Sequence, residues 1–226
     1  RCLSRGLGDV YKRQEDGIVK SGSSNIDSGV GIRSVAGDKS GFAYSNNFNY
    51  ENLISAAKTS KCIVKSGQSR EIQLGNSQNI RKLYNSVSPL DFKTDDIKVK
   101  FLKDIDKYVR DKDDRVEQVI VSLAGTYDSI LVLNTDGIKA FDDRPLVRFS
   151  IMVILKVGDR RERGSSGGGG RYSYDEIIDT KFAYEFADEA IRQAAVNLQA
   201  EDGKAGSMTV VLGPGWPGVL LHEAIG

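Results

Sequence analysis

The chain has 226 residues, of which 39% are hydrophobic and 28% charged, and its 32 basic and 31 acidic residues leave a net charge of +1. This composition is typical of a globular protein that is long enough to bury a sizeable core. The near-neutral balance argues against a general affinity for nucleic acid or anionic membrane, because such binding requires clustered basic charge.

Neither a membrane span nor a secretion signal is predicted. The most apolar run, FSIMVIL at 149–155, is far shorter than the roughly 20 residues that cross a bilayer. The opening stretch RCLSRGLGDVYKRQ lacks the apolar segment of a signal peptide. Cys2 and Cys62 do not make a disulfide framework in a chain of this size. We therefore expect a cytoplasmic protein with reduced cysteines.

Residues 1–14 are basic and without hydrophobic periodicity, so we expect a foreign segment there and begin the fold at Glu15. Residues 15–90 are expected to form an N-terminal α/β subdomain. Apolar residues flank AGDKSG at 36–41 and predict a hairpin. The apolar spacing in 48–67 predicts a helix with Asn49 as N-cap, Gly67 as its stop and Cys62 packed inside.

A polar linker, 68–90, precedes a central α/β subdomain expected over 91–205. Residues 91–113 predict a charged amphipathic helix, whose buried stripe is Phe101, Leu102, Ile105, Tyr108 and Val109. Alternation over 115–160, with a TDG turn at 135–137, predicts three or four antiparallel strands.

The stretch RERGSSGGGGR at 161–171 is the one low-complexity segment. It lacks the Gly-Lys-Ser/Thr of a phosphate-binding loop, so its composition favours a flexible connector over a binding loop. A helix is predicted over 181–200, with one apolar face formed by Phe182, Phe186, Ala187, Ala190, Ile191, Ala194, Ala195 and Leu198.

Residues 206–226 are expected to open a further domain. Met208–Leu212 predicts a short buried strand, and Pro217 suits the first turn of a new helix that carries His222 and Glu223. The fold class predicted for the chain is therefore α+β, with antiparallel sheets packed against long amphipathic helices.

His222 is the only histidine in the chain, and Glu223 follows it directly. In H-E-x-x-H motifs two histidines one turn apart bind zinc, and the glutamate between them acts as a general base. Here the i+4 position is Gly226, so that motif is not met. An i+5 histidine would lie about 140° around an ideal helix from His222 and would need a local break or widening. A packing or surface histidine is the alternative.

Several stretches resemble the TldD/PmbA metallopeptidases, also called modulators of DNA gyrase. They are EDGIVKSGSSNIDSGVGIRSVAGDKSGFAY, SVSPL, DDRPLVR, RERGSSGGGGR and VVLGPGWPGVLLHEAIG. The resemblance is to the TldD branch and extends from Glu15 to Gly226. It implies an H-E-x-x-x-H motif in which His222 is the first metal ligand and Glu223 the catalytic glutamate, with the second histidine next after Gly226.

The resemblance further implies one Zn²⁺ per catalytic subunit. It implies that the third ligand is a cysteine far downstream, and so neither Cys2 nor Cys62. It also implies a largely β C-terminal domain that begins at 206–226 and is truncated. It implies cleavage of unfolded peptides by a heterodimer with a PmbA-like subunit, or by a homodimer. The fragment itself is expected to be inactive. We also expect the glycine-rich stretch to border the peptide path. The candidate substrate-binding residues are Arg161, Arg163, Gly167, Gly168, Gly169, Gly170, Arg171 and Trp216.

Two other functions stay open. A non-catalytic, PmbA-like subunit would enclose peptide for a partner, and a nucleic-acid-associated module is suggested by the gyrase name alone. The near-neutral charge argues against the second.

Overall fold

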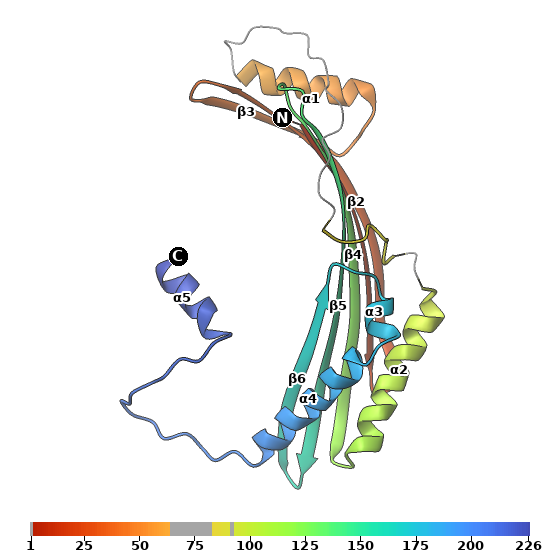
Figure 1. Ribbon diagram of the computed structural model, residues 1–226, viewed down its shortest axis with the longest axis vertical. Helices are drawn as coiled ribbons and strands as arrows, with labels where there is room; N and C mark the ends of the chain where they lie inside the picture. The colour runs from red at the N-terminus through yellow and green to blue at the C-terminus, as the bar shows by residue number, and fades with distance from the viewer. Residues whose placement is uncertain (1, 64–82, 91–92) are drawn as a thin grey trace.

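Six strands form one antiparallel sheet, in the order β3-β2-β1-β4-β5-β6, in the computed structural model, which describes residues 2–63, 83–90 and 93–226 (Figure 1). The strands are β1 Cys2–Glu15, β2 Ile18–Ala36, β3 Lys39–Ser45, β4 Val116–Leu133, β5 Lys139–Val157 and β6 Arg160–Gly170. The helices are α1 Tyr50–Ile63, α2 Asp95–Lys112, α3 Asp175–Ile178, α4 Phe182–Leu198 and α5 Pro217–Ile225. The predicted fold class is confirmed.

Strand β1 occupies residues that the sequence analysis places outside the fold. It pairs antiparallel with β2 on one side and with β4 on the other, and so lies inside the sheet. The turn to β2 is Asp16-Gly17, with φ of 52° and 74°, the left-handed pair that favours a two-residue hairpin. Leaving these residues out of the fold is wrong for this structure, because pairing on both edges stabilises a strand that has no clear apolar pattern. The foreign origin of residues 1–14 stays a prediction.

The expected hairpin and the first expected helix are both present. Strands β2 and β3 pair from Val30↔Ser45 to Ala36↔Lys39, with Gly37 at φ 56° in the turn. Helix α1 follows, and the Asn49 side chain accepts a hydrogen bond from the backbone N–H of Asn52 at 2.9 Å, as an N-cap does.

Cys62 is exposed rather than packed. The predicted stop at Gly67 and most of the predicted linker lie outside the described residues.

The hydrophobic core lies between the sheet and helices α2 and α4. Alternate residues of β4 and β5 are buried, as strand geometry requires of a sheet with one covered face. Helix α2 buries four of the five residues predicted for its stripe, and Tyr108 is partly buried. The segment 115–160 contains two long strands, of 18 and 19 residues, instead of three or four.

The glycine-rich segment forms edge strand β6, paired with β5, and is not a flexible connector. Helix α4 packs against it through four buried alanines, which are Ala183, Ala187, Ala190 and Ala194. The predicted face of this helix is therefore rotated slightly, since Phe182 is 45% exposed and Ala183 is buried. Small residues on both elements let the helix approach the strand closely: a Cβ at Gly164 would lie 2.0 Å from the Ala190 carbonyl oxygen.

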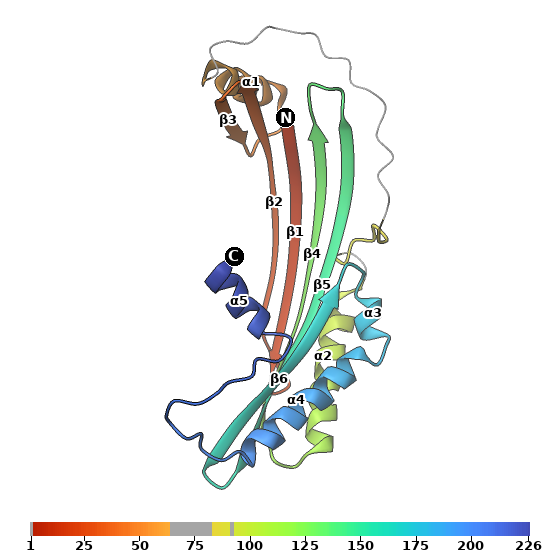
Figure 2. The same cartoon turned by 60° about the vertical axis from the view of Figure 1, so that its left-hand side comes forward.

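Helices α1, α2 and α4 cover one face of the sheet. Figure 2 shows α2, α3 and α4 gathered at one end of the long strands and α1 beside β2 and β3 at the other. Residues paired across strands share a face, and the pairs Glu15↔Ile120, Ile120↔Met152 and Met152↔Ser165 belong to the opposite face. We call this the open face, since no helix packs on it in the described part of the chain.

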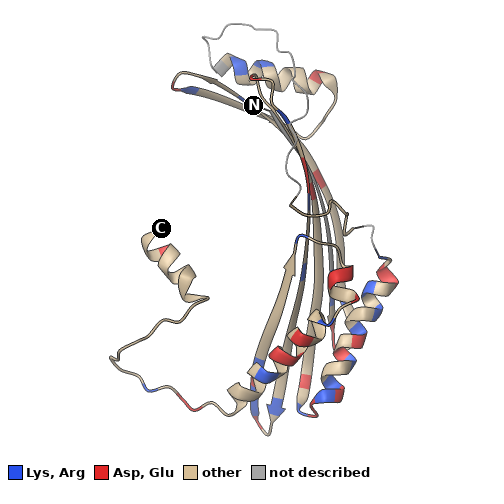
Figure 3. Cartoon of the chain, viewed as in Figure 1, with Lys and Arg blue, Asp and Glu red and all other residues tan. Residues whose placement is uncertain are grey.

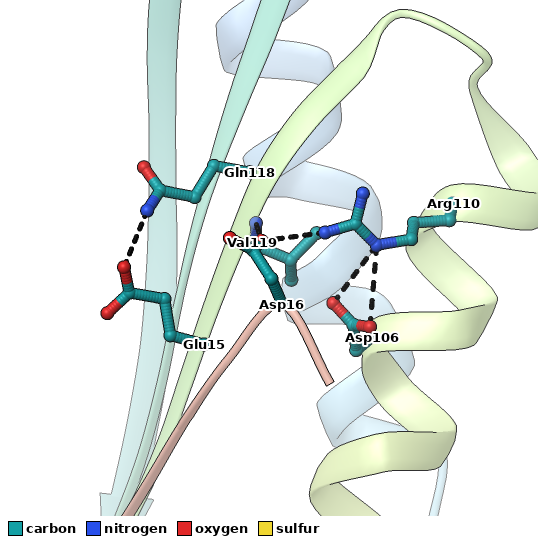
Figure 4. A network of polar contacts seen from close by, with 6 residues as sticks. All are labelled: Glu15, Asp16, Asp106, Arg110, Gln118 and Val119. Atoms are coloured by element: carbon teal, nitrogen blue, oxygen red, sulfur yellow. Dashed lines mark hydrogen bonds and ion pairs between the residues drawn. The ribbon is translucent and has the colours of Figure 1, made fainter. Parts of the chain in front are cut away.

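A polar network ties the β1–β2 turn to α2 (Figure 4). Oδ1 of Asp16 accepts hydrogen bonds from Nη2 of Arg110 at 2.7 Å and from the backbone N–H of Val119 at 3.0 Å. Nε of Arg110 also lies 3.4 Å from the Asp106 carboxylate. The network fixes the turn against both the sheet and the helix, although the exposed Asp16–Arg110 ion pair is worth at most about 1 kcal/mol.

The C-terminal segment stands apart from the sheet and ends in α5 (Figure 1). Met208–Leu212 does not form the predicted buried strand: Met208 is 61% exposed and Val211 is 90% exposed. A strand requires a neighbour for its backbone groups, and within the described residues this segment has none. None of the described helices is both long and apolar enough to span a membrane.

Candidate metal-binding helix and the glycine-rich strand

His222 and Glu223 lie on α5, as the Gly/Pro-rich approach and Pro217 predict. Pro217 occupies the first turn, where its missing N–H costs no helical hydrogen bond. All residues of the helix are accessible, and both His222 and Glu223 are exposed. An imidazole and a carboxylate on successive helical residues are therefore presented together to solvent.

Gly226 occupies the position one turn after His222. Its backbone N–H donates to the His222 carbonyl oxygen at 2.9 Å, and a Cβ built there would lie 3.1 Å from Nδ1 of His222. A side chain at this position would thus be close enough to share an ion with His222, but glycine supplies none.

The described residues do not form a complete metal site. They contain no group of three or more His, Cys, Asp or Glu side chains suited to hold an ion. Tetrahedral zinc takes three or four protein ligands, and His222 offers one. The donor set fits zinc only if further ligands come from other polypeptide segments.

The candidate substrate-binding arginines lie at both ends of β6. Arg161 forms an ion pair with Glu117, which lowers the pKa of that carboxyl. Arg161 and Arg163 both line a pocket of about 590 Å³. Arg163 forms no ion pair with a described residue. At the other end, Nη1 of Arg171 donates to the Pro145 carbonyl oxygen at 3.3 Å, and its guanidinium lies 5.5 Å from the centre of the Tyr84 ring.

The four candidate glycines have different neighbours. Gly167 lines a second pocket, of about 320 Å³, on the open face. A Cβ at Gly168 would meet Phe186 at 2.6 Å, one at Gly169 would meet the Val147 carbonyl oxygen at 1.9 Å, and one at Gly170 would meet Tyr172 at 2.3 Å. A Cβ at Gly167 would itself lie 2.4 Å from the Phe149 carbonyl oxygen, so close packing accounts for all four.

Trp216 is 85% exposed and immediately precedes α5, a helix that stands apart from β6 (Figure 1).

Charged side chains are interspersed in sign along α2 and α4 (Figure 3). Burial raises the pKa of the Tyr174 phenol, and the nearby Asp95 carboxylate adds to the effect. That ring is fully buried beneath Gly125, with Nζ of Lys98 5.1 Å from its centre. The shift reflects core packing and marks no reactive group.

Comparison with known proteins gives the family. Residues 88–198 match the PmbA/TldA metallopeptidase central domain, and residues 13–61 match PmbA/TldA metallopeptidase domain 1. The chain belongs to the PmbA/TldD metallopeptidase family.

Named relatives agree with this membership. A metalloprotease TldD homolog of Haemophilus influenzae is 46% identical over 218 residues, which is 94% of this chain and 45% of the relative. A metalloprotease TldD homolog of Buchnera aphidicola subsp. Schizaphis graminum is 39% identical over the same shares. The chain thus spans about half the length of the curated relatives it matches.

Solved structures share the fold. A modulator of DNA gyrase from Thermotoga maritima superposes with a TM-score of 0.71 at 14% identity, covering 91% of this chain and 46% of the other. TldE from Thermococcus kodakarensis superposes with a TM-score of 0.65 at 16% identity, covering 86% of this chain and 43% of that one.

The sequence analysis missed one polar cluster on the open face. Ser122 and Ser150 lie opposite each other on β4 and β5, and their Oγ atoms are 2.7 Å apart. Exposed Arg148 lines the same pocket. Alternating polar residues along two paired strands were the available signal.

Proposed function

We propose that this chain supplies the first metal ligand and the catalytic carboxylate of a zinc-dependent peptidase that cleaves unfolded peptides. The observation that carries the proposal is the pairing of His222 with Glu223 on one exposed helix, in a chain that belongs to a metallopeptidase family. Because the chain spans about half of its relatives, the activity proposed is that of the full-length protein.

The two side chains take different roles. His222 would hold the ion through its imidazole, with the remaining ligands supplied from outside the described residues. Zinc, when bound, polarises a scissile carbonyl and makes water acidic near neutral pH. Glu223 would accept the proton of the attacking water and later return it to the leaving amine.

The partner and the peptide path follow from the same proposal. We infer assembly with a PmbA-like subunit, or with a second copy of the chain, around an unfolded peptide. Arg161, Arg163, Arg171 and Trp216 remain candidate peptide contacts, as does the strand that carries Gly167–170. The alternative is a non-catalytic subunit that encloses peptide for its partner, and it predicts peptide binding without zinc and without hydrolysis.

The test uses the full-length protein and a denatured protein substrate. Glu223→Gln should retain zinc, measured by mass spectrometry, and lose about 10²–10⁴-fold in rate, the usual effect of removing a general base. His222→Ala should lose both zinc and activity. Glu185→Gln, at an exposed site on α4, is the matched control and should change neither.

Full hydrolysis by the Glu223→Gln protein would refute the role of Glu223. The 226-residue chain alone should bind no stoichiometric zinc and hydrolyse no peptide, and chelator-sensitive turnover by it would contradict the assignment of missing ligands.

A further inference from the structure

The open face carries a pocket of about 320 Å³ that spans β4, β5 and β6. Its lining includes Ile120, Ser122, Arg148, Ser150, Met152 and Gly167. Strand pairing explains why these residues meet: Ser122 lies opposite Ser150, and Ser150 lies opposite Gly167. We propose that this pocket binds the C-terminal carboxylate of a peptide, and the proposal rests on the peptide substrate inferred above.

The polar groups of the pocket include hydrogen-bond donors. The hydroxyls of Ser122 and Ser150 are 2.7 Å apart, so one proton joins them and the other is left to donate outward. Arg148 is exposed and makes no ion pair with any residue in the described ranges. A guanidinium with two hydroxyls beside it matches the two oxygens of a carboxylate.

Two neighbouring arginines on the same face, Arg144 and Arg13, differ from Arg148. Arg144, four residues earlier on β5, donates to Asp142 at 2.6 Å, and Arg13 on β1 pairs with Glu15 at 3.1 Å. The residue opposite Arg148 on β4 is Ala124, which brings no carboxylate. The positive charge of Arg148 is thus left available for a ligand.

Glycines of β6 keep these donors uncovered. Ser150 lies opposite Gly167 and Arg148 lies opposite Gly169, so no β6 side chain projects over either residue. A Cβ at Gly167 would lie 2.4 Å from the Phe149 carbonyl oxygen and 2.9 Å from Cα of Ser150, so glycine at this position lets β6 approach the backbone of β5 closely.

The charge and the apolar surroundings favour a carboxylate over phosphate. Phosphate sites usually combine several cations or a helix N-terminus, whereas this pocket contains one guanidinium. Ile120 and Met152 lie beside the serines on the same face and suit an anion attached to a carbon chain. The terminal carboxylate of an extended peptide has both properties.

The test measures binding rather than hydrolysis, so it stays distinct from the test of Glu223. Full-length protein carrying Glu223→Gln is titrated into an N-terminally labelled, unstructured peptide, as free acid and as C-terminal amide, and fluorescence anisotropy is followed. We expect the free acid to bind about tenfold more tightly. Arg148→Gln should abolish this preference. Lys103→Gln, which removes one charge from the exposed side of α2, should preserve it.

Equal affinity for the acid and the amide overturns the proposal, as does a preference that survives in Arg148→Gln protein. Ser122→Ala with Ser150→Ala provides a second, charge-neutral variant, which should reduce the preference while circular dichroism confirms the fold. Stronger competition by inorganic phosphate than by acetate would refute the choice of a carboxylate ligand.

Discussion

Gly164→Ala tests whether the glycine-rich segment is a packed strand. In the structure a Cβ at Gly164 would lie 2.0 Å from the Ala190 carbonyl oxygen and 2.5 Å from the Ala194 nitrogen, both in the backbone of α4. Ordinary contacts begin near 3.4 Å, so the helix must retreat from β6 by roughly 1.4 Å. Overpacking of this kind costs about 1–3 kcal/mol.

The expected loss in Tm is about 2–12 °C, since 1 kcal/mol shifts the midpoint by about 2–4 °C in chains of 150–250 residues. Thermal unfolding followed by far-ultraviolet circular dichroism measures it. Gly168→Ala should cost less, because its added methyl meets the Phe186 ring, which can rotate away. Gly203→Ala, with no heavy atom within 4 Å, is the control. A Gly164→Ala protein as stable as this control would refute the close seating of α4.

Two further predictions concern polar groups. Tyr174→Phe removes a buried hydroxyl without a hydrogen-bond partner among the described residues, so the unfolding free energy in urea should stay level or rise by up to about 2 kcal/mol. Tyr108→Phe removes a hydroxyl that donates to Asp188 at 2.8 Å and should lower it by about 1 kcal/mol; the reverse ranking would contradict the assignment. Arg192 lowers the pKa of Glu189 to about 2 from its ordinary 4.5, so any stability from this pair is present above pH 4.5 and lost as the pH falls through 2. The carboxyl ¹³C shift should titrate there by NMR and return toward the ordinary value in Arg192→Gln; an unchanged midpoint would refute the pairing.

Sequence periodicity predicted the elements whose signal is local. The α2 stripe follows helical spacing, and the β2–β3 hairpin has a glycine in a two-residue turn between alternating runs. The Asp16-Gly17 turn carries an equally local signal, although the basic composition of 1–14 favours leaving that segment out of the fold. A hairpin turn is defined by its own residues, so Asp-Gly is a stronger signal than composition.

The elements that depend on distant partners were harder to predict. Met208–Leu212 has the residues of a buried strand, yet β propensity describes fit to a neighbouring surface rather than an intrinsic backbone preference. His222 and Glu223 lie on a helix as predicted, because Pro217 is a local start signal. Metal binding by these residues depends on ligands that a local pattern does not contain. Family membership is therefore the observation that favours a metal ligand over a surface histidine at His222.

The glycines of β6 have structural roles on both faces of the strand that composition alone does not reveal. Successive residues of a strand point to opposite faces, so Gly164 and Gly168 meet α4 while Gly167 lines the pocket on the open face. Side chains on the first set would push the helix away, and a side chain at Gly167 would meet the backbone of β5, 2.4 Å from the Phe149 carbonyl oxygen. The glycine-rich run therefore forms a strand that is close-packed against α4 on one face and against the β5 backbone on the other.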